Sequence, residues 1–216
     1  MKFCDDDYRE AIYRAYLNWS DWKDEFEASS WAKLPMLGNQ NRFKKFLSEY
    51  SLARNIRNDS NDSPTKGKER PAQKRVREAL RILKIVEPSD VKESAEGIAK
   101  LASSKEVKKR SQLSLISKVA CFAYPDRFPM WDQFARRGLT RVVDGPECKK
   151  DKFIRTENYC EFAIDFDAEF ENHKKCIQTR IREYTGIPGS DIKHFINSAG
   201  FQRRVFDVLL MNLGRG

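Results

Sequence analysis

Apolar positions in the N-terminal part of the chain recur at steps of three and four residues, the period of an amphipathic helix. The first such run extends from Tyr8 to Trp19, with Arg9 and Arg14 on its polar side. A second run, over residues 39–57, has the same period and predicts another helix. Its inward positions are Phe43, Phe46, Leu47 and Tyr50.

The segment between these two runs is unusually aromatic. It contains Trp22, Phe26 and Trp31, and it directly follows Trp19. Large aromatic side chains dominate protein cores, and a core role is the more common one for such a cluster. We therefore favour packing in the interior over stacking on exposed bases.

Polar turn-forming residues fill positions 58–68, where no apolar residue occurs, and this pattern predicts an exposed loop. Pro71 can begin the helix that follows, and its apolar stripe ends near Val86. Pro88-Ser89-Asp90 is a helix-start signal, which predicts a further helix from Val91 to Leu101.

The C-terminal part again has helical spacing. It predicts a long helix over residues 159–184, interrupted near residues 166–168, and a last helix over 192–213 that breaks at Ala199-Gly200. Arg203 and Arg204 are expected to be exposed on this last helix. We find no convincing alternating strand and no internal repeat, so the expected fold class is all-α.

The expected architecture is a single compact helical unit, or one divided into two lobes. In the divided form, residues of about 70–140 make one lobe, and residues 1–57 together with 141–216 make the other.

The stretch 117–139 holds the residues of greatest chemical interest. It opens as a helix with Lys118 at its head, and Pro125 ends that helix because proline lacks the amide hydrogen. After a short loop and Pro129, Asp132 stands just before a second helix that begins at Gln133. A proline-stiffened corner of this kind can aim Lys118 and Asp132 at one point, as a catalytic pair requires.

The composition narrows the classes of function. The 216 residues carry a formal net charge of +9, which points to a polyanionic partner, most commonly nucleic acid. No apolar run approaches the length of a membrane span, and the N-terminus is acidic where a signal peptide would be basic, so we expect a cytoplasmic protein without a membrane partner. Two histidines and five cysteines without Cys-x-x-Cys spacing predict reduced thiols, no metal site and no cofactor.

Basic residues gather in two places, at residues 66–84 and directly before the Lys118 helix. The second cluster can offer side-chain charge to a phosphate near a helix N-terminus. The residues expected to contact DNA are Lys105, Lys108, Lys109, Arg110, Ser114, Ser117 and Arg136.

Lys118-Val119-Ala120 together with Pro129-Met130-Trp131-Asp132 resembles the lysine-bearing 8-oxoguanine branch of the helix-hairpin-helix DNA glycosylase superfamily. The similarity covers about twenty residues on an all-α background. Residues 112–117 lack the glycine-rich hairpin of that family, and the interval from lysine to aspartate is shorter. The basic cluster with Ser114 and Ser117 would then replace the hairpin as the contact to phosphate.

The resemblance implies a two-lobed glycosylase fold and a chemistry for each residue of the pair. Asp132 would stabilise the positive charge that develops on deoxyribose, or activate water. Lys118 would attack the anomeric carbon as a neutral amine and form a Schiff base, which requires a pKa lowered by burial or by a cation such as Arg127, Arg136 or Arg137. The flipped base needs an apolar pocket or a wedge, for which we expect Trp131, Phe134, Phe122 and Tyr124.

The first expectation is therefore a DNA glycosylase, with or without lyase activity, that removes a damaged or modified base from double-stranded DNA. Its role would be DNA repair or, as a minority alternative, antiviral defence through excision of a hypermodified phage base. Two other hypotheses stay open: a non-catalytic helical module that binds DNA or RNA, and a protein-interaction partner in a defence or toxin system. No obligatory protein partner is evident. The ordinary interpretation of the pair is a solvated lysine and an N-cap aspartate.

Overall fold

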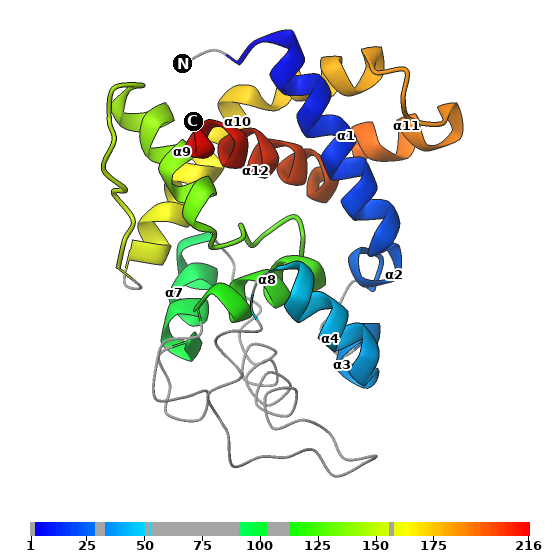
Figure 1. Cartoon of the computed structure of the whole chain (residues 1–216), viewed down its shortest axis with the longest axis horizontal. Coiled ribbons are helices and arrows are strands. Elements are labelled where there is room, and N and C mark those ends of the chain that lie inside the picture. Colours follow the sequence, from blue (N-terminus) through cyan, green and yellow to red (C-terminus); the bar gives the residue numbers. More distant parts are fainter. Residues whose placement is uncertain (1–2, 29–32, 51, 53–90, 103–112, 156–157) are drawn as a thin grey trace.

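The computed structural model describes residues 3–28, 33–50, 52, 91–102, 113–155 and 158–216, and every regular element within these ranges is a helix (Figure 1). The all-α expectation is confirmed for this part of the chain. The helices are α1 (Asp5–Asp21), α2 (Lys23–Phe26), α3 (Pro35–Gly38), α4 (Gln40–Glu49), α7 (Val91–Ala102), α8 (Leu113–Ala123), α9 (Gln133–Asp144), α10 (Tyr159–Glu183), α11 (Gly189–Asn197) and α12 (Ala199–Arg215).

Helix α1 buries the stripe that its spacing predicts. Tyr8, Ile12, Ala15 and Trp19 are all buried, and the helix packs against α12. Its first turn contains three aspartates, which suit the positive end of a helix dipole. The prediction of an amphipathic first helix is therefore confirmed.

The aromatic segment after α1 forms part of the core, as expected for Trp19, Trp22 and Phe26; Trp31 lies outside the described residues. Trp22 and Phe26 contact Phe122 of α8, with ring centroids 5.5 and 4.5 Å away, and Phe46 of α4 contacts the same ring at 5.7 Å. This cluster fixes α8 against α2 and α4. Figure 1 shows α8 beside α4, with the segment that leads to α9 rising toward α12.

Helix α10 runs without a break from Tyr159 to Glu183, so the predicted interruption near residues 166–168 is wrong. Phe162, Phe166 and Phe170 follow one another at four-residue steps and are all buried, which keeps the helical period through this region. No glycine or proline occurs within α10, so nothing in the backbone forces an interruption.

The C-terminal segment divides into two helices, as predicted, but the break lies at Ser198, and Ala199-Gly200 begin α12. Helix α11 ends at Asn197 and α12 begins at Ala199. Ser198 lies between them as the N-cap of α12, and its Oγ accepts a hydrogen bond from the Phe201 backbone N–H at 3.2 Å.

Two further predictions concern helix bounds. Helix α4 ends at Glu49, so within the described part of the chain it is shorter than the helix expected over residues 39–57. Helix α7 confirms the helix expected from Val91 to Leu101. The predicted loop at 58–68, the helix from Pro71 to Val86 and its start signal at 88–90 lie outside the described residues.

Candidate functional site

Helix α8 is buried on almost every side, which is unusual for a helix that carries a lysine. All its residues from Leu115 to Ala123 are buried, including Lys118, of which 4 % is exposed. The helix begins at Leu113, so Lys118 lies in its middle and the prediction that it heads the helix is wrong. The helix ends two residues before Pro125, as predicted.

Three hydrogen bonds fix the corner between α8 and α9 to its surroundings. The backbone N–H of Trp131 donates to Ser117 Oγ at 3.1 Å, and the hydroxyl of Tyr159 donates to the Pro129 carbonyl at 2.9 Å. Arg203 Nη2 donates to the Arg127 carbonyl at 3.4 Å. Partners from α8, α10 and α12 thus hold the loop that carries the aspartate.

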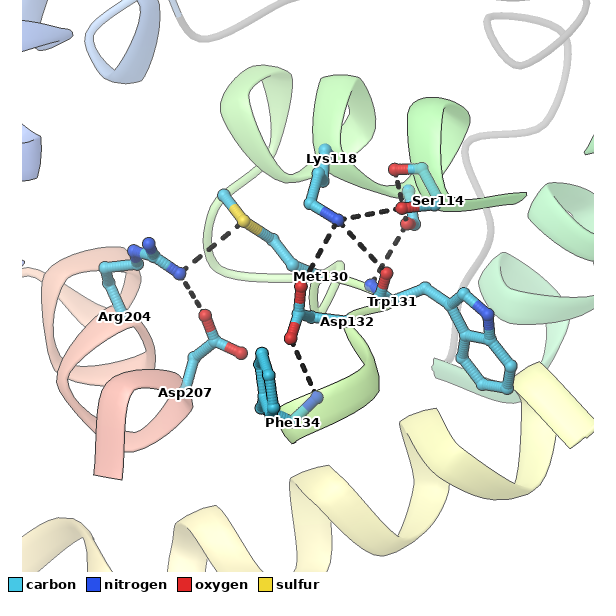
Figure 2. Close-up of polar contacts among 9 residues, drawn as sticks. Ser114, Lys118, Met130, Trp131, Asp132, Phe134, Arg204 and Asp207 are labelled. Carbon is cyan, nitrogen blue, oxygen red and sulfur yellow. Dashed lines mark hydrogen bonds and ion pairs between the residues drawn. The ribbon is translucent and has the colours of Figure 1, made fainter. Parts of the chain in front are cut away.

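Lys118 and Asp132 meet across this corner (Figure 2). Lys118 Nζ lies 3.7 Å from Asp132 Oδ2, and it donates hydrogen bonds to Ser114 Oγ at 2.8 Å and to the Trp131 carbonyl at 3.2 Å. The other carboxylate oxygen, Oδ1, accepts from the Phe134 backbone N–H at 2.9 Å and caps α9. Asp132 therefore acts as an N-cap and also pairs with Lys118, and the interpretation of Lys118 as a solvated lysine is wrong.

Burial lowers the pKa of the Lys118 ammonium, because the charged form loses its hydration. Asp132 and Asp207 oppose this effect, since a nearby negative charge favours the ammonium. Arg204 reinforces it as a nearby cation. The sequence pointed to other arginines for this role, on the corner itself and on α9, whereas the structure provides one from α12.

Arg203 and Arg204 are not exposed, so that prediction is wrong. Arg203 is 6 % exposed, pairs with Asp167 of α10 and lies over the ring of Phe166. Arg204 donates to Asp207 and to Asn18 Oδ1 of α1 at 3.1 Å. The reason is that α12 is enclosed by its neighbours on most sides, so its polar residues find partners inside the protein.

Asp207 is a residue of this site that the sequence analysis missed. It is 3 % exposed; Oδ2 accepts from Arg204 Nη1, and the buried Oδ1 has no hydrogen-bond partner within the described structure. Its pKa is raised to about 6, chiefly by burial and also by Asp132, while Arg204 and Lys118 oppose the rise. The available signal was a lone carboxylate between Phe206 and Val208, in an otherwise apolar run.

The residues expected to contact DNA lie in two different situations. Lys105, Lys108, Lys109 and Arg110 fall outside the described residues. The other three have partners inside the protein: Ser114 accepts from Lys118, and Ser117, fully buried, accepts from Trp131. Arg136 pairs with Asp151 at 3.0 Å and stacks on Trp131 at 4.5 Å.

Of the four aromatic residues expected around a flipped base, two are buried and two are partly exposed. Phe122 is completely buried in the core, and Trp131 is buried against Tyr159 and Phe162, with centroids 5.6 and 5.4 Å away. Neither ring can meet a base while it stays in this packing. Phe134 and Tyr124 are partly exposed, and Phe134 directly follows the helix start that Asp132 caps.

A small cavity lies between the corner and α12, and neither Lys118 nor Asp132 lines it. Met130, Cys121, Arg204 and Asp207 contribute to its walls, and its volume of about 10 Å³ is roughly that of one water molecule. A nucleobase does not fit there without movement of the surrounding side chains. The exposed part of the site is Asp132, whose side chain is 26 % exposed.

Comparisons of the chain with protein-family models, with curated proteins and with solved structures found no match. Among the residues that the structure describes, no group of three or more histidine, cysteine or acidic side chains is arranged to hold a metal ion. None of the described helices is both long enough and apolar enough to span a membrane.

Proposed function

We propose that the protein is a DNA glycosylase that excises a damaged or modified base, with Asp132 as the charge-stabilising carboxylate and Lys118 as the amine nucleophile. One observation carries this proposal: a buried lysine whose pKa is lowered by burial has its Nζ 3.7 Å from a partly exposed carboxylate. A solvated ion pair would have neither feature.

The chemistry assigns a separate task to each group. Cleavage of the glycosidic C–N bond sends the electron pair to the departing base, which takes up a proton, and leaves positive charge on the sugar. The Asp132 carboxylate stabilises that charge. The neutral Lys118 amine forms a C–N bond to the anomeric carbon and gives up one proton to Asp132 or to solvent. The C1′–O4′ bond then breaks, its electron pair goes to O4′, which takes up a proton, and a protonated Schiff base is left, from which strand cleavage follows by β-elimination.

Access to the pair comes from the side of Asp132. Lys118 is almost completely buried, and its Nζ has Ser114 Oγ and the Trp131 carbonyl as hydrogen-bond acceptors. A flipped base must therefore enter beside Asp132 and displace neighbouring side chains, among them the partly exposed Phe134, two residues further along the chain. The substrate class is double-stranded DNA with a base that is already easy to unstack or is marked by a bulky modification.

The test is a panel of duplex oligonucleotides that carry oxidised, alkylated, deaminated and glucosylated bases, assayed for abasic sites and for covalent trapping by borohydride. We expect one class of substrate to give both signals. Lys118→Ala should abolish trapping, and Asp132→Asn should abolish base release. The matched control is Lys152→Ala, which removes the lysine of a more exposed pair, Lys152–Asp165, at 3.1 Å.

Other results of this assay decide between the alternatives. Base release that survives Lys118→Ala would keep the glycosylase and assign Asp132 to the activation of water. Binding that falls steeply with salt and survives both variants, without release of any base, would contradict the proposal and favour a non-catalytic nucleic-acid-binding module. Release of a glucosylated base but not of repair lesions would identify phage DNA as the target.

A further inference from the structure

A chain of polar contacts joins Tyr50, α1 and α12 and ends at Asp207. Asn18 Nδ2 of α1 donates to the hydroxyl of Tyr50, which follows α4, at 2.7 Å. Asn18 Oδ1 accepts from Arg204 Nε at 3.1 Å, and Arg204 Nη1 donates to Asp207 Oδ2. Since every link is partly or fully buried, this chain holds the Arg204 guanidinium in one position.

Arg204 is also attached to the corner itself. Its Nη1 lies 3.5 Å from the sulfur of Met130, two residues before Asp132 (Figure 2). The guanidinium therefore acts on Lys118 as a fixed cation inside the protein, where charge interactions are weakly screened. A fixed cation next to a lysine favours the neutral amine.

Asp207 opposes that cation. In Figure 2 its carboxylate lies between Arg204 and Asp132, with one oxygen on Arg204 and the other without a hydrogen-bond partner in the described structure. The charged groups that act on it are Arg204 on its own helix, Lys118 on α8 and Asp132 at the start of α9; the thiol of Cys121 on α8 is coupled to it as well. Two cations and two carboxylates are thus gathered in one cluster, of which Asp132 is the most exposed member.

We propose that Asp207 is a positioning residue that sets the protonation state of Lys118: as a carboxylate it neutralises Arg204 and favours the ammonium, and as a neutral acid it lets Arg204 favour the amine. The inference rests on the proposed function, because a nucleophilic lysine must be neutral. A neutral amine with a neutral acid has the same net charge as an ammonium with a carboxylate. The cluster can therefore exchange one form for the other without a change in its total charge.

The raised pKa of Asp207, about 6, supports this role because the group then titrates near neutral pH. Asp132 stays available as the carboxylate that faces the sugar.

The test measures the pKa of Lys118 directly in the free protein. Lysine is labelled with ¹³C at Cε, the Lys118 signal is assigned by its loss in Lys118→Arg, and its shift is followed against pH. We expect Asp207→Asn to lower the pKa of Lys118 and Arg204→Gln to raise it. The matched control is Asp167→Asn, which removes the carboxylate of a comparable pair on the adjacent residue, Arg203, and should leave the Lys118 titration unchanged.

An unchanged Lys118 titration in Asp207→Asn, or an equal shift in Asp167→Asn, would overturn the proposal. Asp207→Glu keeps the charge, so Lys118 should titrate in this variant as it does in wild type. A shift in Asp207→Asn that is absent in Asp207→Glu is therefore due to the lost charge and not to a structural change. The titration of Lys118 uses no DNA, so its outcome does not depend on whether the glycosylase assay succeeds. With an active substrate, borohydride trapping is measured at pH 6 and at pH 8 for each protein. The ratio of trapping at pH 6 to trapping at pH 8 should be about threefold or more higher for Asp207→Asn than for wild type.

Discussion

Gly138 of α9 packs directly against the backbone carbonyl of Leu210 of α12. A Cβ at Gly138 would overlap that carbonyl, and a Cβ at Gly214 would likewise overlap the carbonyl of Phe134. These two glycines let α9 and α12 approach more closely than helices with side chains at the contact can. Because Asp132 caps α9 and Asp207 lies on α12, the close approach also determines how near the two carboxylates come.

Replacement of Gly138 by alanine should therefore destabilise the protein. Its Cβ meets backbone rather than a movable side chain, so the helices must separate, and we expect a loss of about 2–3 kcal/mol in the free energy of unfolding. Urea denaturation measures it. The control is Gly38→Ala in α3, where no atom lies within 4 Å of the added Cβ, and its stability should equal or exceed that of wild type. Equal stabilities of the two variants would contradict the close approach.

The two roles of Asp132 can be separated by two substitutions. Asparagine is as good an N-cap as aspartate, so Asp132→Asn should keep the hydrogen bond to the Phe134 N–H and most of the stability while it removes the charge. Alanine removes both and should cost about 1 kcal/mol more. Thermal unfolding and base release are measured for each. If excision depends on the carboxylate, both variants lose it; full activity in Asp132→Asn would assign the residue to capping alone.

Ser117 should matter for stability rather than for contact with DNA. Ser117→Ala leaves the buried backbone N–H of Trp131 without its acceptor, which should cost about 1–3 kcal/mol and loosen the corner. Ser190→Ala on α11 is the control, since that hydroxyl is exposed and its removal should cost little. An equal, small effect at both positions would show that the corner does not depend on this bond.

The local features of the site could be predicted from the sequence. Pro125 ends α8 and Asp132 caps α9 because both effects act through the backbone of neighbouring residues. The position of Lys118 in its helix was predicted incorrectly, because the apolar positions Leu113, Leu115 and Ile116 already belong to α8. Local rules therefore predicted the boundaries marked by a proline or a cap at the corner better than the start of α8.

The contribution of α12 could not be predicted in the same way. Arg203 and Arg204 were expected on the surface because arginine is usually exposed, yet tertiary packing encloses both. Which buried groups they meet depends on how α12 crosses α1, α9 and α10, and no spacing within residues 199–215 encodes that. Asp207 was missed for the same reason.

The pH dependence of stability provides a last prediction for Asp207. Its pKa is about 6 in the folded protein against an ordinary value of 3.8, so between these two pH values the folded state binds more protons than the unfolded state. The free energy of unfolding must therefore fall as pH rises from about 4 to about 7, by about 3 kcal/mol from this group. Asp207→Asn lacks the titration, so wild type should lose stability relative to this variant over that range. Urea denaturation at half-unit pH steps measures the difference, with Asp167→Asn as the control. Parallel profiles for wild type and Asp207→Asn would show that burial does not raise the pKa of this carboxyl. If wild type instead gains stability relative to Asp207→Asn as pH rises, the pairing of Asp207 with Arg204 outweighs its loss of hydration.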